Sequence, residues 1–194
     1  MNKTTLIISV GGSIEPILYS IKNNNPDTVI FFVSYITRDI VKGKIISNLQ
    51  KADNTHIPYD FILTPDEQSI GKSTFVLLNE IPKITKKLTG QMKFPEMVDY
   101  TGGTKTMSAA LVWACSEYSK KFSYIGSLYP SGRDKNRAGI VISGQERSFL
   151  SENPWNQIAF FEINKGIDLF NQNLFPQAIK IFEKAEKKIT NEKK

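Results

Sequence analysis

The 194-residue sequence contains one cysteine and one histidine, which restricts the chemistry open to it. A single cysteine excludes a disulfide framework and a cysteine-rich zinc site. His56 has no second histidine for a metal pair or a serine–histidine triad. Cys115 falls on the apolar stripe of a predicted helix, so we interpret it as a core residue rather than a nucleophile. We therefore expect neither a metal nor a cofactor.

Long apolar runs are also absent: no stretch approaches the roughly 20 residues that span a membrane. The amino terminus leads directly into a predicted strand, without the apolar region of a signal peptide. We therefore expect a cytoplasmic protein with no membrane partner. The net charge of +6 favours an acidic partner, but many lysines gather near the carboxyl terminus. Charge alone supports nucleic acid only weakly, and we expect no direct contact with duplex DNA.

Short apolar strands alternate with amphipathic helices along most of the chain. The expected strands cover residues 6–10, 28–33, 60–63, 96–100 and 122–126. Residues 139–142 are expected to add a strand antiparallel to 122–126, after a loop rich in glycine and charge. This alternation predicts an α/β fold, a Rossmann-like three-layer sandwich with a mostly parallel sheet and an antiparallel edge.

The character of the sequence changes near Ser151, where helical signals replace the alternation. Asn153 and Pro154 are suited to begin a helix that runs to about Phe170, and a second helix begins near Pro176. This short C-terminal helical pair resembles one tetratricopeptide-type unit. We expect a ligand-binding domain over 1–150. The helical pair over 151–194 would serve dimerisation, act as a linker or begin an effector domain.

The stretch from Asp99 to Met107 joins the end of a strand, a glycine turn and the start of a helix. Two glycines let a ligand approach the backbone closely. The first helical turn has free N–H groups and no acidic residue, so it favours an anion, with Lys105 and the threonine hydroxyls as its cradle. This pattern predicts a phosphate site. The alternative is that Thr104 only caps the helix and Lys105 is only solvated.

A second strand, glycine turn and helix unit occurs at Gly11-Gly12-Ser13, where Ser13 is placed equally well to cap the helix or to bind phosphate. The carboxyl ends of parallel strands share one edge, so we expect both glycine turns to lie together there. Gly71-Lys72-Ser73-Thr74 is not a phosphate loop, because Asp66 stands where the first glycine is needed. A dinucleotide site is disfavoured, since Gly-x-Gly-x-x-Gly is missing.

The Ser-Val-Gly-Gly-Ser and Asp-Tyr-Thr-Gly-Gly-Thr-Lys-Thr-Met-Ser-Ala-Ala segments resemble a CARF domain, the CRISPR-associated Rossmann fold of type III accessory effectors. The resemblance covers about residues 4–145. It implies a homodimer that binds a cyclic oligoadenylate of four or six adenylates (cA4 or cA6) in antiviral defence. The matching ligand-binding positions are Gly11, Gly12, Ser13, Ile14, Thr101, Gly102, Gly103, Thr104, Lys105 and Thr106. Ser34, Tyr35 and Thr37 are plausible wall residues, and the loop 128–133 is a candidate cover.

The resemblance leaves two functions open. The first is an allosteric sensor that controls an attached or associated effector, and it is the one we favour. The second is a ring nuclease, in which a 2′-hydroxyl of the bound ring attacks its own phosphodiester without a metal. Lys105 and Ser13 are the candidates to stabilise the developing charge in that reaction.

Overall fold

The structure is a computed structural model that describes residues 3–53, 57–127, 132, 141–142 and 144–191. The chain divides into two compact units, residues 1–150 and 151–194. The first unit is an α/β domain and the second is built of helices. No described helix combines the length and apolar character that crossing a membrane requires.

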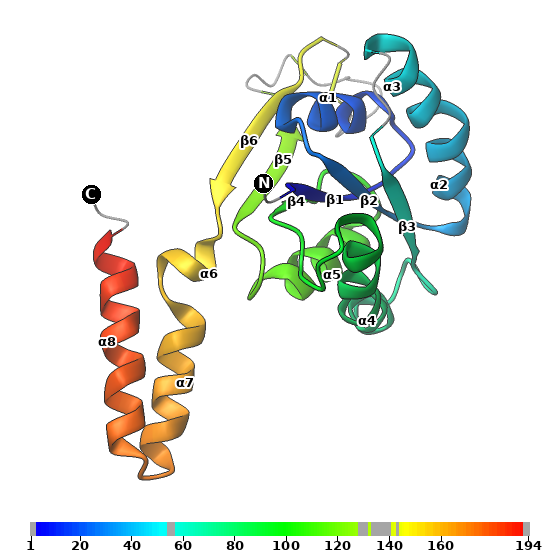
Figure 1. The fold of residues 1–194 in the computed structure, drawn as a ribbon. Coiled ribbons are helices and arrows are strands. Elements are labelled where there is room, and N and C mark those ends of the chain that lie inside the picture. Colours follow the sequence, from blue (N-terminus) through cyan, green and yellow to red (C-terminus); the bar gives the residue numbers. More distant parts are fainter. Residues whose placement is uncertain (1–2, 54–56, 128–131, 133–140, 143, 192–194) are drawn as a thin grey trace. The chain divides into compact units, whose positions relative to one another are not determined.

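The first unit is organised around a six-stranded sheet with the order β3-β2-β1-β4-β5-β6 (Figure 1). The strands are β1 (Thr5–Ser9), β2 (Thr28–Val33), β3 (Tyr59–Leu63), β4 (Met97–Asp99), β5 (Lys121–Gly126) and β6 (Arg147–Glu152). All pairs from β3 to β5 are parallel, and β6 adds the antiparallel edge. The predicted α/β fold class, a Rossmann-like sandwich, is therefore confirmed.

The antiparallel edge strand of the described residues is β6, which the sequence pattern did not predict. Residues 139 and 140 lie outside the described residues, while Val141 forms an isolated bridge and Ile142 belongs to no strand. The β6 sequence Arg-Ser-Phe-Leu-Ser-Glu has no continuous apolar run, and most of its residues are exposed. An edge strand faces solvent and tolerates polar residues, so local pattern does not signal it.

Helices cover both faces of the sheet (Figure 1). One face carries α1 (Glu15–Asn24), α2 (Tyr35–Ile40), the π-helical turn η1 (Val41–Ile45) and α3 (Ile46–Asp53), and the other carries α4 (Ile70–Thr89) and α5 (Lys105–Cys115). A helical segment follows β2, as the alternation of strands and helices predicts, with η1 inserted where Gly43 lies. Pro82 neither ends nor divides α4.

The core fills both spaces between sheet and helices. Leu6 and Ile8 of β1 pack with Ile17 and Ile21 of α1 in one cluster. On the other face, α5 buries the predicted stripe of small and apolar residues up to Cys115. Cys115 is 0% exposed, which confirms its interpretation as a core residue, and this burial raises the pKa of its thiol to about 12. The helical spacing of the stripe extends in the sequence to Tyr118, but α5 ends at Cys115 and Tyr118 is half exposed.

The second unit contains α6 (Pro154–Gln157), α7 (Phe160–Asn171) and α8 (Phe175–Asn191). Asn153 caps α6 as predicted, because its side chain accepts a hydrogen bond from the backbone N–H of Trp155. The expected single helix to Phe170 is divided by Ala159, which has a left-handed backbone conformation. Helices α7 and α8 cross closely where Gly166 faces the ring of Phe182. The predicted helical pair is thus present.

Candidate functional site

The candidate site lies where the strand order of the sheet reverses. The chain proceeds from β1 outward to β2 and β3, then returns to place β4 on the other side of β1. In open α/β sheets, ligands bind outside the carboxyl ends of the strands at such a point. Gly11-Gly12-Ser13 follows β1 and Thr101-Gly102-Gly103 follows β4. The two glycine motifs found in the sequence therefore meet at the switch point of the fold.

The two glycine turns pack backbone against backbone. A Cβ atom on Gly102 would lie 2.7 Å from the amide nitrogen of Gly11, and one on Gly11 would lie 2.9 Å from the amide nitrogen of Gly103. Real Cβ atoms do not approach backbone atoms so closely. The hydroxyls of Ser9 and Ser108 both donate to the carbonyl oxygen of Gly102, at 2.7 and 3.0 Å. This turn is therefore tied to both β1 and α5.

Asp99 also binds the same turn, through hydrogen bonds to its side chain. Its carboxylate accepts hydrogen bonds from the Thr101 backbone N–H at 2.9 Å and from the Ser20 and Ser123 hydroxyls at 2.5 and 3.0 Å. Burial raises the pKa of the Asp99 carboxyl, and the bonds from Ser20, Thr101 and Ser123 offset part of that rise. The Thr101 hydroxyl in turn accepts from the backbone N–H of Ile125 at 2.7 Å.

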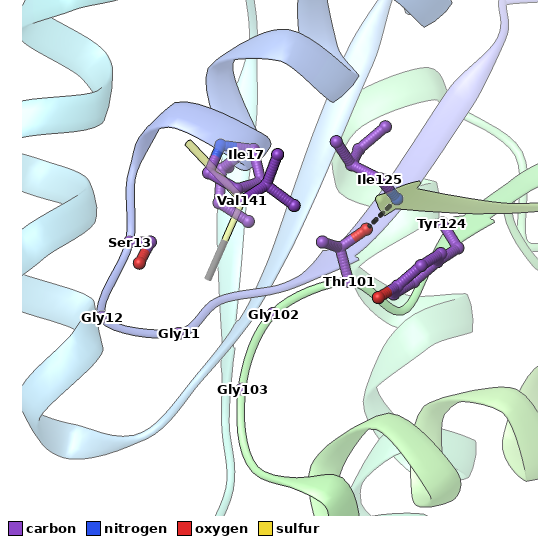
Figure 2. Close-up of a pocket in the computed structure, with 11 residues that line it drawn as sticks. Gly11, Gly12, Ser13, Ile17, Thr101, Gly102, Gly103, Tyr124, Ile125 and Val141 are labelled. Carbon is purple, nitrogen blue, oxygen red and sulfur yellow. Dashed lines mark hydrogen bonds between the residues drawn. The ribbon is translucent and has the colours of Figure 1, made fainter. Parts of the chain in front are cut away.

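Between these elements is a pocket of about 180 Å³ (Figure 2). Its lining consists of Gly11, Gly12, Ser13, Pro16, Ile17, Thr101, Gly102, Gly103, Tyr124, Ile125 and Val141. Figure 2 shows the two glycine turns side by side, with the Tyr124 ring next to Thr101. None of the described lining residues carries a charged side chain. Binding there would rest on backbone N–H groups, the hydroxyls of Ser13 and Thr101, and the Tyr124 side chain with its ring and phenolic hydroxyl.

The first turn of α1 opens onto this pocket without a side-chain cap. Its N-cap residue is Ile14, which makes no capping hydrogen bond. Ser13 therefore does not cap the helix, and none of the described residues hydrogen-bonds to its hydroxyl. The unpaired N–H groups at a helix N-terminus carry partial positive charge and attract anions. Of the two roles open to Ser13 in the sequence, the structure excludes capping.

The threonines and lysine of the second motif lie partly outside the pocket. Thr104 caps α5 by accepting from the backbone N–H of Met107 at 3.1 Å, and its hydroxyl donates to the carbonyl oxygen of Glu67 at 2.7 Å. Lys105 is exposed on the first turn of α5, and neither it nor Thr106 is among the lining residues. The capping role that the sequence left open for Thr104 is thus the one that the structure shows.

The residues after β2 are also engaged in local structure. Ser34 and Thr37 form a capping box at the start of α2, in which each side chain accepts from the other residue's backbone N–H. Tyr35 is 69% exposed, with the Arg38 guanidinium 5.2 Å from the centre of its ring.

Ile14, another predicted site residue, packs against the core. The structure does not bring these four predicted residues into the described lining, and the candidate cover 128–133 lies outside the described residues except for Gly132.

Several lining residues were not predicted. Pro16 and Ile17 come from α1, Tyr124 and Ile125 from β5, and Val141 from the segment before β6. Tyr124 had a usable signal, because it lies near the carboxyl end of a predicted strand, the edge where the site was expected. Its ring stacks on Tyr100 with the ring centres 5.8 Å apart. Among the described residues, no group of three histidine, cysteine or acidic side chains gathers into a metal site.

Comparisons with known proteins give a likeness of structure and none of sequence. No protein-family model and no curated protein matches the chain. Csm6 from Enterococcus italicus, solved bound to cyclic hexa-2′-fluoro-hexa-dAMP, matches 95% of this chain with a TM-score of 0.62 and 11% identity. The chain shares the fold of the part of Csm6 that it matches. The predicted likeness to a CARF domain is therefore confirmed at the level of the fold.

A second structure supports the same fold. Protein VC1899 from Vibrio cholerae matches 68% of this chain with a TM-score of 0.52 and 11% identity. The chain covers 49% of the Csm6 chain and 34% of the VC1899 chain. It therefore spans half or less of the length of these two proteins.

Proposed function

We propose that residues 1–150 form a sensor domain that binds a cyclic oligoadenylate, cA4 or cA6, in type III CRISPR antiviral defence. The observation that carries the proposal is the joining of the two glycine turns beside the uncapped start of α1. This arrangement offers backbone N–H groups to an anion at the switch point of the sheet. A protein with the same fold, Csm6, is bound to a cyclic hexanucleotide analogue, which supports this class of ligand.

The proposed binding mode gives each part of the site its own role. A phosphate lies against Gly12 and the first turn of α1, within reach of the Ser13 hydroxyl. The exposed Lys105 adds positive potential at the edge of the site. The Tyr124 ring offers an apolar face to a base or ribose. Thr101, Gly102 and Gly103 form the floor.

One copy of the site is too small for a whole ring. The pocket holds about 180 Å³, whereas ligand pockets typically measure about 300–1,000 Å³. A cyclic oligonucleotide with two-fold symmetry presents the same groups twice, and an isologous dimer supplies two copies of one site. The proposed ligand therefore calls for a homodimer in which two pockets face the same ring.

The first unit has a surface suited to such a partner, on the side chains that α4 and α5 turn away from the sheet. Ile70, Phe75, Leu78 and Trp113 line an apolar groove there, and their exposed fractions are 52, 71, 42 and 68%. Contiguous exposed apolar surface of this kind marks interaction sites. The groove begins near the site. The backbone carbonyl oxygen of Glu67, three residues before Ile70, accepts a hydrogen bond from the Thr104 hydroxyl. We assign this surface, the α4–α5 face, to a second copy of the chain.

The helical unit over residues 151–194 would pass the binding signal to an attached or associated effector. One helical pair leaves apolar surface exposed: Ile167, Phe170 and Ile179 are 45, 55 and 57% exposed. Helical pairs of this type normally bury such surface against neighbouring elements. This unit therefore offers a surface through which ligand-driven changes reach an effector.

A ring nuclease is the second candidate function. The observation that favours it is the Ser13 hydroxyl, which lines the pocket and bonds to none of the described residues. Such a hydroxyl is free to stabilise charge on a phosphate while the adjacent ribose 2′-hydroxyl attacks in line, which breaks the bond to the 5′-oxygen of the next nucleotide and leaves a 2′,3′-cyclic phosphate. Lys105, the other candidate, lies outside the described lining, which gives the sensor the stronger support.

The testing experiment incubates purified protein with radiolabelled cA4 and cA6 in the presence of a chelator. A native gel measures binding, and chromatography of the same samples over time measures cleavage. Binding with intact ligand supports the sensor, and conversion to short linear products that Ser13→Ala abolishes supports the ring nuclease. Binding of neither ring contradicts the proposed function. A linear hexaadenylate serves as the ligand control.

A further inference from the structure

Asp99 joins three elements of the first unit through one buried carboxyl group. Asp99 is the last residue of β4, and it is 0% exposed. One carboxylate oxygen accepts from the backbone N–H of Thr101, at 2.9 Å. The other accepts from the hydroxyls of Ser20 on α1 and Ser123 on β5, at 2.5 and 3.0 Å. The three donors therefore belong to three different segments of the chain.

Each donor lies next to a wall of the ligand pocket. Ser20 is one helical turn beyond Ile17, and Ser123 immediately precedes Tyr124. Thr101 is itself a lining residue. The helix, the strand and the glycine turn that line the pocket are thus all hydrogen-bonded to a single side chain. The side-chain amide of Asn24 donates to the Ser20 hydroxyl at 3.2 Å and extends the network along α1.

Stability alone does not account for a carboxyl group at this position. No ion pair joins Asp99 to a cation among the described residues, and its neighbours across the sheet are the apolar Ile8 of β1 and the neutral Ser123 of β5. A buried carboxyl group without a cation is costly. Its hydrogen bonds specify one arrangement of the groups around it, which an apolar residue does not do.

We propose that Asp99 is the positioning residue of the ligand pocket, which holds α1, β5 and the glycine turn at the spacing that the ligand requires. The inference rests on the proposed function, since the ligand is the cyclic oligoadenylate named there. Asp99 does not line the pocket itself, so it acts through Ser20, Thr101 and Ser123.

The test compares Asp99→Asn with Asp99→Ala by titration with cA4 and cA6. Asparagine keeps an acceptor for the Thr101 N–H, and its amide donates to serine hydroxyls that rotate to accept. We expect Asp99→Asn to bind within about threefold of the unmodified protein and Asp99→Ala to bind at least about tenfold more weakly, as expected when several hydrogen bonds are lost together. Rescue by the isosteric variant separates positioning from general packing.

Ser20→Ala and Ser123→Ala each remove one link while leaving Asp99 in place. We expect each to weaken binding by about two- to tenfold, the effect of one hydrogen bond. Thr28→Val is the matched control. The Thr28 hydroxyl donates a buried hydrogen bond to the Thr5 hydroxyl at 2.9 Å, at the ends of β1 and β2 that are opposite to the pocket. It should lower the melting temperature without changing the affinity.

Amide hydrogen exchange of the ligand-free variants provides a second readout that does not depend on the ligand. Asp99→Ala should raise exchange at Thr101–Gly103 and at Tyr124–Ile125, whereas Thr28→Val should not. Failure of the unmodified protein to bind either ring contradicts the proposed function, and unchanged exchange in Asp99→Ala then overturns the positioning role as well. A protein that binds, with Asp99→Ala binding equally tightly, overturns the positioning role alone.

Discussion

Gly11 and Gly102 lie so close that neither can carry a side chain. A Cβ atom on Gly102 would lie 2.7 Å from the Gly11 amide nitrogen, and one on Gly11 would lie 2.9 Å from the Gly103 amide nitrogen. Gly12, which follows Gly11 in the same turn and lines the pocket, has open space around its Cβ position. The glycines of the site therefore serve two purposes: Gly11 and Gly102 permit the turns to pack, and Gly12 leaves room for a ligand.

Alanine substitutions at Gly102 and Gly12 should separate these purposes. Gly102→Ala forces backbone apart, which costs about 1–3 kcal/mol, and each kcal/mol lowers the melting temperature of a chain this size by about 2–4 °C. Gly12→Ala should leave the melting temperature within about 2 °C, the effect of an ordinary surface change, but should weaken cyclic oligoadenylate binding. Thermal unfolding and ligand titration of both variants test the contrast.

Gly43→Ala is the control for these substitutions, because the Cβ position of Gly43 is equally open and lies away from the pocket lining. Gly103 is less suited to a ligand-blocking variant, since its φ of 80° strains any other residue. Normal affinity in Gly12→Ala and in the larger Gly12→Leu would show that no ligand approaches this turn.

Lys105→Ala should weaken cyclic oligoadenylate binding while the protein stays folded, because Lys105 is exposed and no described residue pairs with it. We expect a loss of about tenfold or more, the effect of one hydrogen bond to a charged group. The loss should shrink as salt is raised from 50 to 500 mM, since salt screens exposed charges. Lys86→Ala, an exposed lysine on α4, is the matched control, and equal affinity in both variants would remove Lys105 from the site.

Trp113→Asp should convert the proposed dimer to a monomer. Trp113 is 68% exposed in the apolar groove of the α4–α5 face, so a charge there costs the monomer little and the interface much. Sedimentation velocity with and without ligand measures the change. Met92→Asp provides the comparison, because Met92 is 67% exposed on a different surface. Persistence of the dimer in Trp113→Asp would place the interface elsewhere, and a monomeric unmodified protein with bound ligand would exclude the homodimer.

Asp99→Asn should change how stability depends on pH. Because burial raises the pKa of Asp99 in the folded protein above 3.8, the unfolded chain loses this proton first as pH rises. Stability is therefore lost as pH rises from about 4 through the folded pKa. The melting temperature of Asp99→Asn minus that of the unmodified protein should increase between pH 4 and 8. A constant difference over this range would show that the Asp99 pKa is not raised.

The sequence predicted most of the first unit because its signals are local. The strand over 28–33 has the predicted bounds, and the stripe from Met107 to Cys115 is buried as expected. Edge strand β6 was missed, since a mostly exposed strand needs no apolar run. The roles of Ser13 and Thr104 were open because both residue types cap helices and bind phosphate equally well.

The sequence by itself determined that this chain alternates strands and helices, and that glycine turns follow two of the strands. Apolar runs, helical periodicity and glycine act over a few residues, so they can be read without the fold. Only the tertiary structure decided that Gly11 packs on Gly102 and that α1 begins uncapped at the pocket. It also decided that the Asp99 carboxylate accepts a hydrogen bond from the hydroxyl of Ser20, 79 positions away. Such contacts depend on the order of strands in the sheet, which no local pattern specifies.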